Sequence, residues 1–306
     1  MNSRSILEAI GNTPLVKINL KENRQIYAKL EYLNPGGSVK ARPAKYLIEE
    51  SERQELLKPG ETIIEAFTGN QSMALAMIGR AKGYNVIITV SENITIEKRN
   101  ALKAYGATVI TCPETDSLQD SRSYYSEAIR IHKQTSKSFM SNQYFTKANR
   151  LVHEKTTGPE IWQQTKGKIT HFFAAAGTGG MISGIGRYLK SKNRRIKIIA
   201  AEVNHSYQNG NSLYQVDEMG MNFNSPALDY SIIDDIIEIS NEQALESLEE
   251  LAQNHGILVG PSSGAVTYMT KLYAEKMKPE NLGVMIFADS GHAHLSKELY
   301  NTAVIY

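Results

Sequence analysis

The chain has 306 residues, of which 34 are lysine or arginine and 32 are aspartate or glutamate, so its formal net charge is only +2. This near balance argues against a surface dedicated to nucleic acid or to anionic membranes. The single cysteine, Cys112, excludes a disulfide within the chain and a cysteine-rich metal site.

The sequence also lacks signals for export or for membrane insertion. Residues 1–4 (Met-Asn-Ser-Arg) begin no apolar signal core. No apolar run reaches the about 18–20 residues that a membrane-spanning helix needs. We therefore expect a cytoplasmic protein that binds no membrane, no nucleic acid and no metal.

Short apolar runs rich in β-branched residues alternate with longer helical patterns along the chain. Continuous apolar runs are typical of parallel strands that are covered by helices on both faces. The alternation predicts an α/β fold with twisted, mostly parallel sheets. The predicted strands are 61–66, 85–90, 108–111, 169–175, 196–201 and 283–288, and the predicted helices are 43–53, 72–82, 95–105, 181–190 and 241–254.

The β-α-β rhythm recurs before and after about residue 145, which predicts two lobes with a cleft between them. We assign residues 41–144 to a smaller lobe, and residues 1–40 together with 145–306 to a larger one. In open α/β sheets, ligands bind outside the carboxyl ends of the strands. Functional motifs are therefore expected at turns that lead from a strand into a helix.

A lysine ends the glycine-containing turn of residues 34–40 (Asn-Pro-Gly-Gly-Ser-Val-Lys). Lys40 lies where the next predicted helix begins, so it faces the positive end of that helix dipole. This position favours the neutral amine, which is the form that can become a Schiff base. The alternative is an ordinary solvated lysine, which is the commoner role of a lysine considered alone.

Residues 176–181 (Ala-Gly-Thr-Gly-Gly-Met) follow a predicted strand and open a predicted helix. Closely spaced glycines expose backbone N–H groups at a helix N-terminus, which favours a phosphate site. A dinucleotide-binding G-x-G-x-x-G motif is the rival, but Ile182 stands where its third glycine belongs. A tight turn without a ligand is the remaining alternative.

Two further turns carry polar side chains. In residues 65–72 (Glu-Ala-Phe-Thr-Gly-Asn-Gln-Ser), Asn70 can donate a hydrogen bond, and the N–H groups that follow can hold a carboxylate. In residues 260–265 (Gly-Pro-Ser-Ser-Gly-Ala), a serine hydroxyl can hydrogen-bond a ring nitrogen. In both turns the alternative is an ordinary N-cap, formed in the first by Thr68, Asn70 or Ser72.

These four segments, in this order, resemble the cysteine synthase family of pyridoxal-phosphate enzymes, which shares the tryptophan synthase β fold. The resemblance implies a fold type II enzyme with the cofactor in the cleft, a mobile smaller lobe, a larger lobe that anchors the cofactor, and a homodimer. The segments that carry it are 11–16, 28–33, 34–40, 103–107, 157–162, 177–180, 256–260 and 289–291.

The resemblance also implies a role for each site residue. Lys40 matches the lysine that forms the Schiff base and moves protons. Asn70 matches the residue that bonds the ring hydroxyl, and Ser262 matches the serine that faces the pyridine nitrogen. The phosphate would be held by Gly177, Thr178, Gly179, Gly180 and Met181. The substrate would be held by Phe67, Thr68, Gly69, Gln71, Gln143 and Asn222.

A serine beside the ring nitrogen makes the ring a weaker electron sink than a carboxylate would. The resemblance therefore implies loss of a β-leaving group from a small amino acid, followed by addition of a small nucleophile. O-acetylserine plus sulfide, giving cysteine, is the first choice on family frequency. The alternatives are a cystathionine β-synthase type of reaction with homocysteine, a cysteine lyase that releases sulfide, and a phosphoserine-dependent synthase of the diaminopropionate type.

The sequence departs from the family pattern at the substrate loop, which usually reads Thr-Ser-Gly-Asn-Thr-Gly. Here Phe67 and Gln71 replace two threonines, and Gln71 can still donate a hydrogen bond whereas Phe67 cannot. Met181 replaces a threonine of the phosphate loop, and Asn222 stands where cystathionine β-synthases carry an aspartate. A non-enzymatic alternative follows, in which the chain is a regulatory protein that binds pyridoxal phosphate and docks the tail of a partner acetyltransferase.

The sequence shows neither an N-terminal haem region nor a C-terminal regulatory module. A long, regulated cystathionine β-synthase is therefore not expected.

Overall fold

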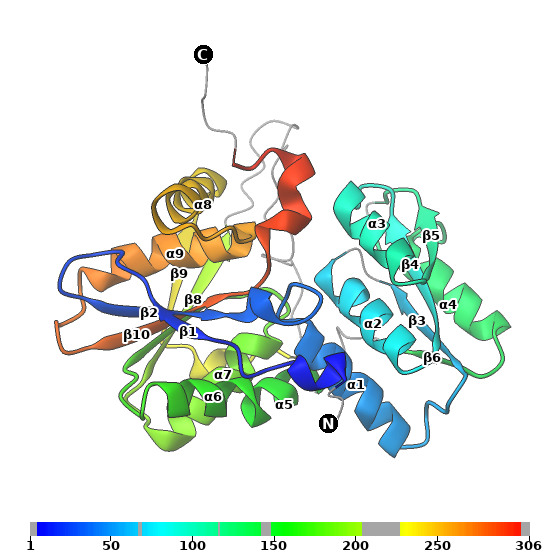
Figure 1. Ribbon diagram of the computed structural model, residues 1–306, viewed down its shortest axis with the longest axis horizontal. Helices are drawn as coiled ribbons and strands as arrows, with labels where there is room; N and C mark the ends of the chain where they lie inside the picture. Colours follow the sequence, from blue (N-terminus) through cyan, green and yellow to red (C-terminus); the bar gives the residue numbers. More distant parts are fainter. Residues whose placement is uncertain (1–4, 67–68, 116, 142–147, 204–226, 301–306) are drawn as a thin grey trace, which may run out of the picture. The chain divides into compact units, whose positions relative to one another are not determined.

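The computed structural model describes residues 5–66, 69–115, 117–141, 148–203 and 227–300. The chain packs into two compact units, one formed by residues 1–10 and 34–143 and the other by residues 11–33 and 144–306. Each unit contains a sheet flanked by helices (Figure 1), which confirms the predicted α/β class. The lobe limits of 41–144 and of 1–40 with 145–306 stay a prediction.

The first unit contains a four-stranded sheet in the order β5-β4-β3-β6, and all of its neighbouring strands are parallel. The apolar runs of the sequence predict β3, β4 and β5 but not β6. The strands are β3 (Thr62–Ala66), β4 (Asn85–Ser91), β5 (Thr108–Cys112) and β6 (Ser138–Met140).

Helices cover both faces of this sheet. Ile63 of β3 packs in one cluster with Ala44 and Ile48, whereas Ile64 packs in another with Ala128 and Ile131. Neighbouring residues of a strand point to opposite faces, so α1 and α4 lie on different sides of β3. The helices are α1 (Ala41–Arg53), α2 (Asn70–Ala81), α3 (Ile96–Ala104) and α4 (Tyr124–Gln134), preceded by the short η1 (Ile6–Ala9).

The second unit contains a six-stranded sheet in the order β1-β2-β10-β7-β8-β9. Only β1 and β2 pair in antiparallel fashion, and β2 pairs in parallel with β10, which comes from the far end of the chain. The strands are β1 (Leu15–Lys17), β2 (Gln25–Leu30), β7 (His171–Ala175), β8 (Lys197–Val203), β9 (Asp235–Ile239) and β10 (Leu282–Phe287).

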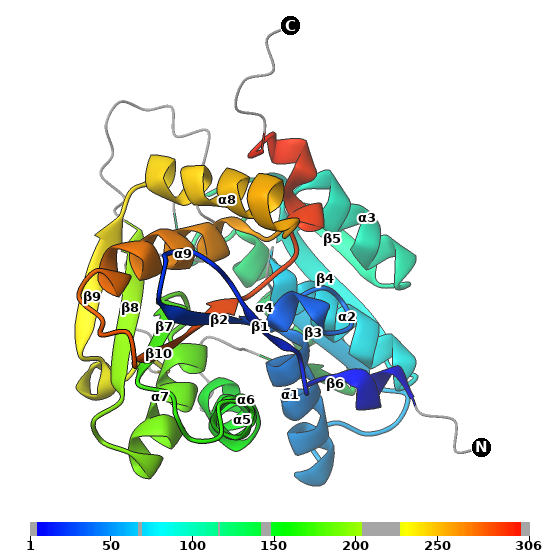
Figure 2. The same ribbon diagram turned by 60° about the vertical axis from the view of Figure 1, so that its left-hand side comes forward.

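Two groups of helices lie on opposite faces of this second sheet (Figure 2). Helices α8 and α9 pack over Phe173 and Met285, whereas α6 and α7 pack over Phe172 and Val284. The helices are α5 (Ala148–Lys155), α6 (Thr157–Gln164), α7 (Gly180–Lys192), α8 (Asn241–His255) and α9 (Pro261–Ala274), with the short η2 (Glu31–Leu33), η4 (Tyr230–Ile232) and η5 (Gly291–Lys297).

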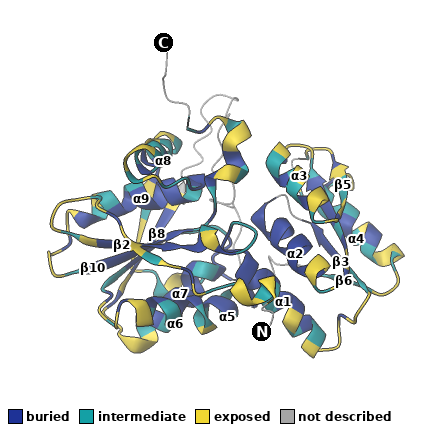
Figure 3. Ribbon diagram, in the orientation of Figure 1, coloured by how far each residue is buried: buried dark blue, intermediate teal, exposed yellow. Residues whose placement is uncertain are grey.

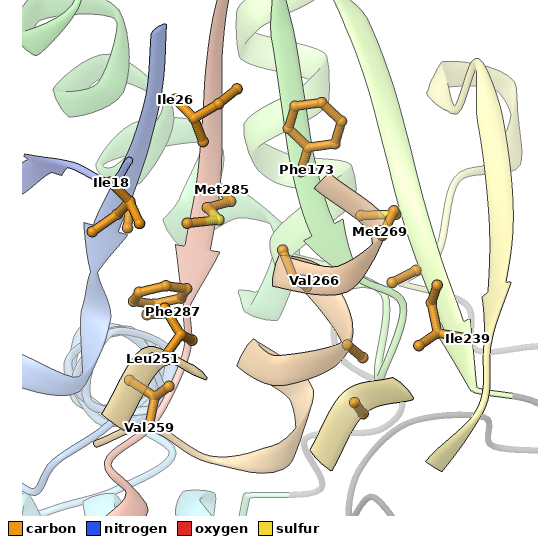
Figure 4. Close-up of a cluster of buried hydrophobic side chains, with 14 of the residues drawn as sticks. Ile18, Ile26, Phe173, Ile239, Leu251, Val259, Val266, Met269, Met285 and Phe287 are labelled. Atoms are coloured by element: carbon orange, nitrogen blue, oxygen red, sulfur yellow. The ribbon is translucent and has the colours of Figure 1, made fainter. Parts of the chain in front are cut away.

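The core beneath α9 joins strands from distant parts of the sequence. Ile26 of β2, Met285 of β10 and Phe173 of β7 lie in one buried cluster with Val266 and Met269 of α9 (Figure 4). Full burial of an apolar side chain of this size contributes about 1.5–3 kcal/mol. Strand β10 is buried along its whole length (Figure 3), as its continuous apolar run predicted, whereas β5 and β9 are mostly exposed or half-buried.

Three of the segments that carry the family resemblance meet in a buried polar network of the second unit. The Lys29 side chain is fully buried, and its Nζ donates to the Thr13 carbonyl at 2.7 Å, to Glu160 Oε2 at 2.7 Å and to Gln164 Oε1 at 3.0 Å. The Thr13 hydroxyl donates to Glu31 Oε1 at 2.6 Å. A buried cation requires such partners. These motifs therefore stabilise the fold.

Across the described parts of the chain, no helix combines the length and apolarity that crossing a bilayer would require.

Candidate active site

Lys40 lies in the first unit, at the N-cap of α1. Its side chain is only 8% exposed, so it is a buried lysine rather than a solvated one. Its φ of −69° and ψ of −14° are already helical, and its carbonyl accepts a hydrogen bond from the Ala44 N–H at 3.1 Å. The predicted position at the start of a helix is thus the observed one.

The turn from β3 into α2 brings polar side chains to the carboxyl edge of the same sheet. Gly69 is the N-cap of α2 and supplies no side-chain cap, so none of the three residues considered for that role is the N-cap. Asn70, Gln71 and Ser72 form the first turn of the helix, and all three are buried. The first N–H groups of a helix have no partner within the helix, and together with the positive end of the dipole they make a helix start attractive to a carboxylate.

Several buried polar atoms at this edge have no hydrogen-bond partner. They are Glu65 Oε2, both side-chain amide atoms of Gln71, and Ser141 Oγ. Glu65 precedes the last residue of β3, and Ser141 follows the neighbouring strand β6, where its N–H donates to the Ile64 carbonyl at 3.3 Å. Folded proteins leave few buried polar groups unsatisfied. Their concentration at the carboxyl ends of parallel strands indicates a ligand site.

Glu65 lies at this edge of the sheet and was not among the site residues that the sequence predicted. Burial raises the pKa of Glu65 to about 8, and the positive charge of Lys40 opposes part of this rise. Burial also raises the pKa of Tyr124, the first residue of α4, and the charge of Glu65 adds to that effect. An acid among the apolar residues of a strand was the available signal.

The glycine-rich loop lies in the second unit, between β7 and α7. Gly179 has a φ of +79°, and a Cβ atom there would lie 2.6 Å from the Leu228 Cα. A Cβ atom on Gly180 would lie 2.5 Å from Asn149 Cγ, and Asn149 Nδ2 donates to Thr178 Oγ1 at 3.0 Å. Glycine is therefore required at both positions. The loop leads into the N-terminus of a 13-residue helix, which fits a phosphate group.

Ser262 lies half-buried in the first turn of α9. The N-cap of this helix is Gly260, so neither serine of the motif is the cap. The neighbouring Ser263 is fully buried, and its Oγ accepts a hydrogen bond from the Ala288 N–H at 3.1 Å. Ser263 therefore holds the helix to the end of β10. Ser262 is the hydroxyl better placed to face a ligand.

Four residues assigned to the substrate fall outside the described residues, namely Phe67, Thr68, Gln143 and Asn222. Their roles stay predictions. Within the described ranges, no three or more histidine, cysteine, aspartate or glutamate side chains gather in a way that could hold a metal ion.

Replacing Gln71 with leucine is expected to stabilise the ligand-free protein. The Gln71 side chain is fully buried, and its two polar atoms lack partners. An apolar replacement of similar size removes that desolvation cost, so the free energy of unfolding should rise by about 1–3 kcal/mol. Urea unfolding measures the change.

Gln164→Leu provides the contrasting variant for this experiment. Gln164 accepts a hydrogen bond from Lys29 and donates one to the Thr13 carbonyl at 2.9 Å. Its replacement should lower the free energy of unfolding. A loss of stability in Gln71→Leu as well would show that the Gln71 amide is already satisfied in the folded protein.

Comparison with known proteins connects this geometry to an enzyme family. A family model described as "Pyridoxal-phosphate dependent enzyme" matches residues 6–289. The cystathionine beta-synthase of Apis mellifera is 39% identical over 304 residues, and the match covers 95% of this chain and 60% of that protein. The cysteine synthase of Staphylococcus aureus is 38% identical over 304 residues, and the match covers 97% of each chain.

A solved structure shows the same fold. The crystal structure of O-ureido-L-serine synthase matches with a TM-score of 0.89 at 30% sequence identity, over 99% of this chain and 96% of that one. The chain thus spans almost the whole of this protein and of the staphylococcal relative, but 60% of the length of the Apis mellifera protein.

Proposed function

The chain belongs to the pyridoxal-phosphate-dependent enzymes, and from this premise we propose that it catalyses β-elimination and β-replacement on a three-carbon amino acid. The observation that carries the proposal is the carboxyl edge of the first unit's sheet, where buried polar atoms without partners accompany the buried Lys40. A ligand with several polar groups would satisfy such atoms.

When bound, pyridoxal phosphate supplies an electron sink that acidifies the substrate Cα–H and allows a β-substituent to leave. Lys40 would hold the cofactor covalently, and its amine would accept the Cα proton. Asn70 would donate its amide N–H to the ring hydroxyl, and the Ser262 hydroxyl would face the ring nitrogen. The N–H groups of residues 177–181 would hold the phosphate, as the glycine requirement at Gly179 and Gly180 supports.

The substrate carboxylate would bind at the N-terminus of α2. The N–H groups of Gly69 and Gln71 can donate to it, and so can the Gln71 side-chain amide. The lack of any present partner for that amide supports this role. Phe67, Thr68 and Gln143 complete the proposed set, with Asn222 on the substrate side.

For the reaction itself, O-acetylserine and sulfide, giving cysteine, are the first choice. The cysteine synthase of Staphylococcus aureus supports it, because the match covers 97% of both chains. A cystathionine β-synthase type of reaction is the second candidate, since the Apis mellifera protein is 39% identical. We also propose a cytoplasmic homodimer, for which light scattering should give twice the mass of 34.0 kDa.

The visible spectrum of the purified holoenzyme tests this function. O-acetylserine, serine, cysteine and phosphoserine are added in separate cuvettes. O-acetylserine should shift the cofactor's absorption band, and sulfide should then restore it. A response to serine with homocysteine would favour the second candidate instead. A cofactor band that no amino acid shifts would contradict catalysis and favour a regulatory protein that docks an acetyltransferase tail.

A further inference from the structure

Glu65 is a buried acid that none of the roles above uses. Its side chain is 2% exposed, and Oε2 makes no hydrogen bond. It stands in the strand sequence Thr62–Ala66, whose other residues after Thr62 are Ile63, Ile64 and Ala66. Burial of an unsatisfied carboxyl group costs free energy. Its presence at the end of β3 therefore calls for a function.

The geometry of β3 and α1 places Glu65 on the side of Lys40. Glu65 shares a face of β3 with Ile63, because side chains two residues apart on a strand point the same way. Ile63 lies in the same buried cluster as Ala44 and Ile48 of α1, and those two residues form a row at four-residue spacing that begins at Lys40. Glu65 therefore lies on the face of β3 that is directed toward this cluster, and Lys40 begins the row of α1 residues that belongs to it.

The chain direction brings the two groups to the same end. A connection of only eight residues, 54–61, joins the end of α1 to the start of β3. The start of α1 therefore lies toward the end of β3, and this is where Lys40 and Glu65 stand. The effect of the Lys40 charge on Glu65 agrees with this placement.

Among the described residues, Lys40 is the only cation whose charge affects the pKa of Glu65. Helix α4 contributes Tyr124, whose pKa is raised by burial and by the charge of Glu65. Strand β4 contributes Thr89, whose Oγ1 donates to the Tyr124 carbonyl at 2.7 Å. Lys40 is therefore the charged partner of Glu65 in this part of the chain.

We propose that Glu65 and Lys40 titrate as a pair that holds one proton between them, which each group exchanges with water. In one state Glu65 holds the proton as a carboxylic acid and the Lys40 amine is neutral. In the other state Glu65 has given its proton to water, the Lys40 amine has taken one from water, and the pair is a carboxylate and an ammonium. Water is the only other reactant. A low-dielectric surrounding keeps the neutral state accessible, because burial disfavours charged forms.

This arrangement would keep the Lys40 amine available as a base. Glu65 acts through Lys40, so it is a positioning residue. The catalytic role of the Glu65–Lys40 pair rests on the proposed function, but the experiment that tests the pair does not. The experiment uses cofactor-free, full-length protein, so it can succeed or fail independently of any chromophore or turnover.

Short pulses of acetic anhydride at a series of pH values report the neutral fraction of each lysine, because only the neutral amine reacts. Mass spectrometry follows Lys40, with the exposed Lys58 as internal reference. In Glu65→Gln the labelling midpoint of Lys40 should move to lower pH by about 1 unit or more, since the carboxylate that favours the ammonium is gone. Glu49→Gln changes an exposed position of α1, so the labelling midpoint of Lys40 should equal that of the wild type.

Equal Lys40 midpoints in the wild type, Glu65→Gln and Glu49→Gln would overturn the proposal. A second measurement applies even if Glu65→Gln does not fold. In Lys40→Met, the infrared C=O band of a buried carboxylic acid should persist to higher pH than in the wild type, because the neighbouring cation no longer favours ionisation. Identical titration of this infrared band in Lys40→Met and in the wild type would also overturn the proposal.

Discussion

Lys40→Ala is expected to abolish the visible absorption of the purified enzyme and to lower its turnover by at least about 10²–10⁴-fold, which is the usual contribution of a positioned proton-transfer group. The variant would lose both the covalent anchor and the base that accepts the Cα proton. Alanine itself should not disrupt the helix, because α1 begins at Ala41 and Lys40 makes no side-chain cap. Absorption spectra and steady-state rates with O-acetylserine and sulfide check the result.

Lys45→Ala is the matched control for this experiment. Lys45 lies on the same helix and is only partly buried, and its Nζ donates to the Leu7 carbonyl at 2.9 Å. That variant should keep both the absorption band and most of the turnover. A Lys40→Ala protein that retained the band would show that another lysine binds the cofactor, and the proposed site would be wrong.

Glu65→Gln is expected to make the cofactor-free protein more stable than the wild type at alkaline pH but not at acidic pH. The folded pKa of Glu65 is raised to about 8 from an ordinary 4.5. Between these values the folded state binds a proton that the unfolded state has lost. The wild type therefore loses about 1.4 kcal/mol of its free energy of unfolding per pH unit from this group. The loss is absent below pH 4.5 and complete above pH 8.

Hydrogen exchange of peptides from β3 and β4 measures this effect within the first unit. Exchange should be slower in Glu65→Gln than in the wild type near the upper end of the window, and the difference should shrink as the pH falls. Glu49→Gln should follow the wild type, because Glu49 is exposed. Stability differences that do not change with pH would mean that the carboxyl group of Glu65 titrates normally.

The sequence predicted the buried parallel strands better than the other strands. All six apolar runs form strands, whereas β1, β2, β6 and β9 were missed. β1 and β6 have only three residues each, too few for a periodic signal. β2 lies inside its sheet, but Lys29 interrupts its apolar pattern, and only the partners of Lys29 in α6 make its burial understandable.

The candidate site was predictable to the extent that it depends on glycines and helix starts. Gly179 and Ser262 lie at strand-to-helix turns, as their local sequence indicated. Glu65 was not predictable in the same way, because an acid in a strand normally faces solvent. Its importance follows from burial and from the position of Lys40, which are properties of the folded chain.

The pairing of β2 with β10 has a consequence for the order in which the protein can fold during synthesis. The strands of the first unit all lie between Thr62 and Met140, so its sheet can form as soon as that stretch has left the ribosome. In the second unit, Gln25 is paired with Leu282, and β10 separates β2 from β7. The hairpin of β1 and β2 must therefore wait, with an open edge, until β10 has been translated.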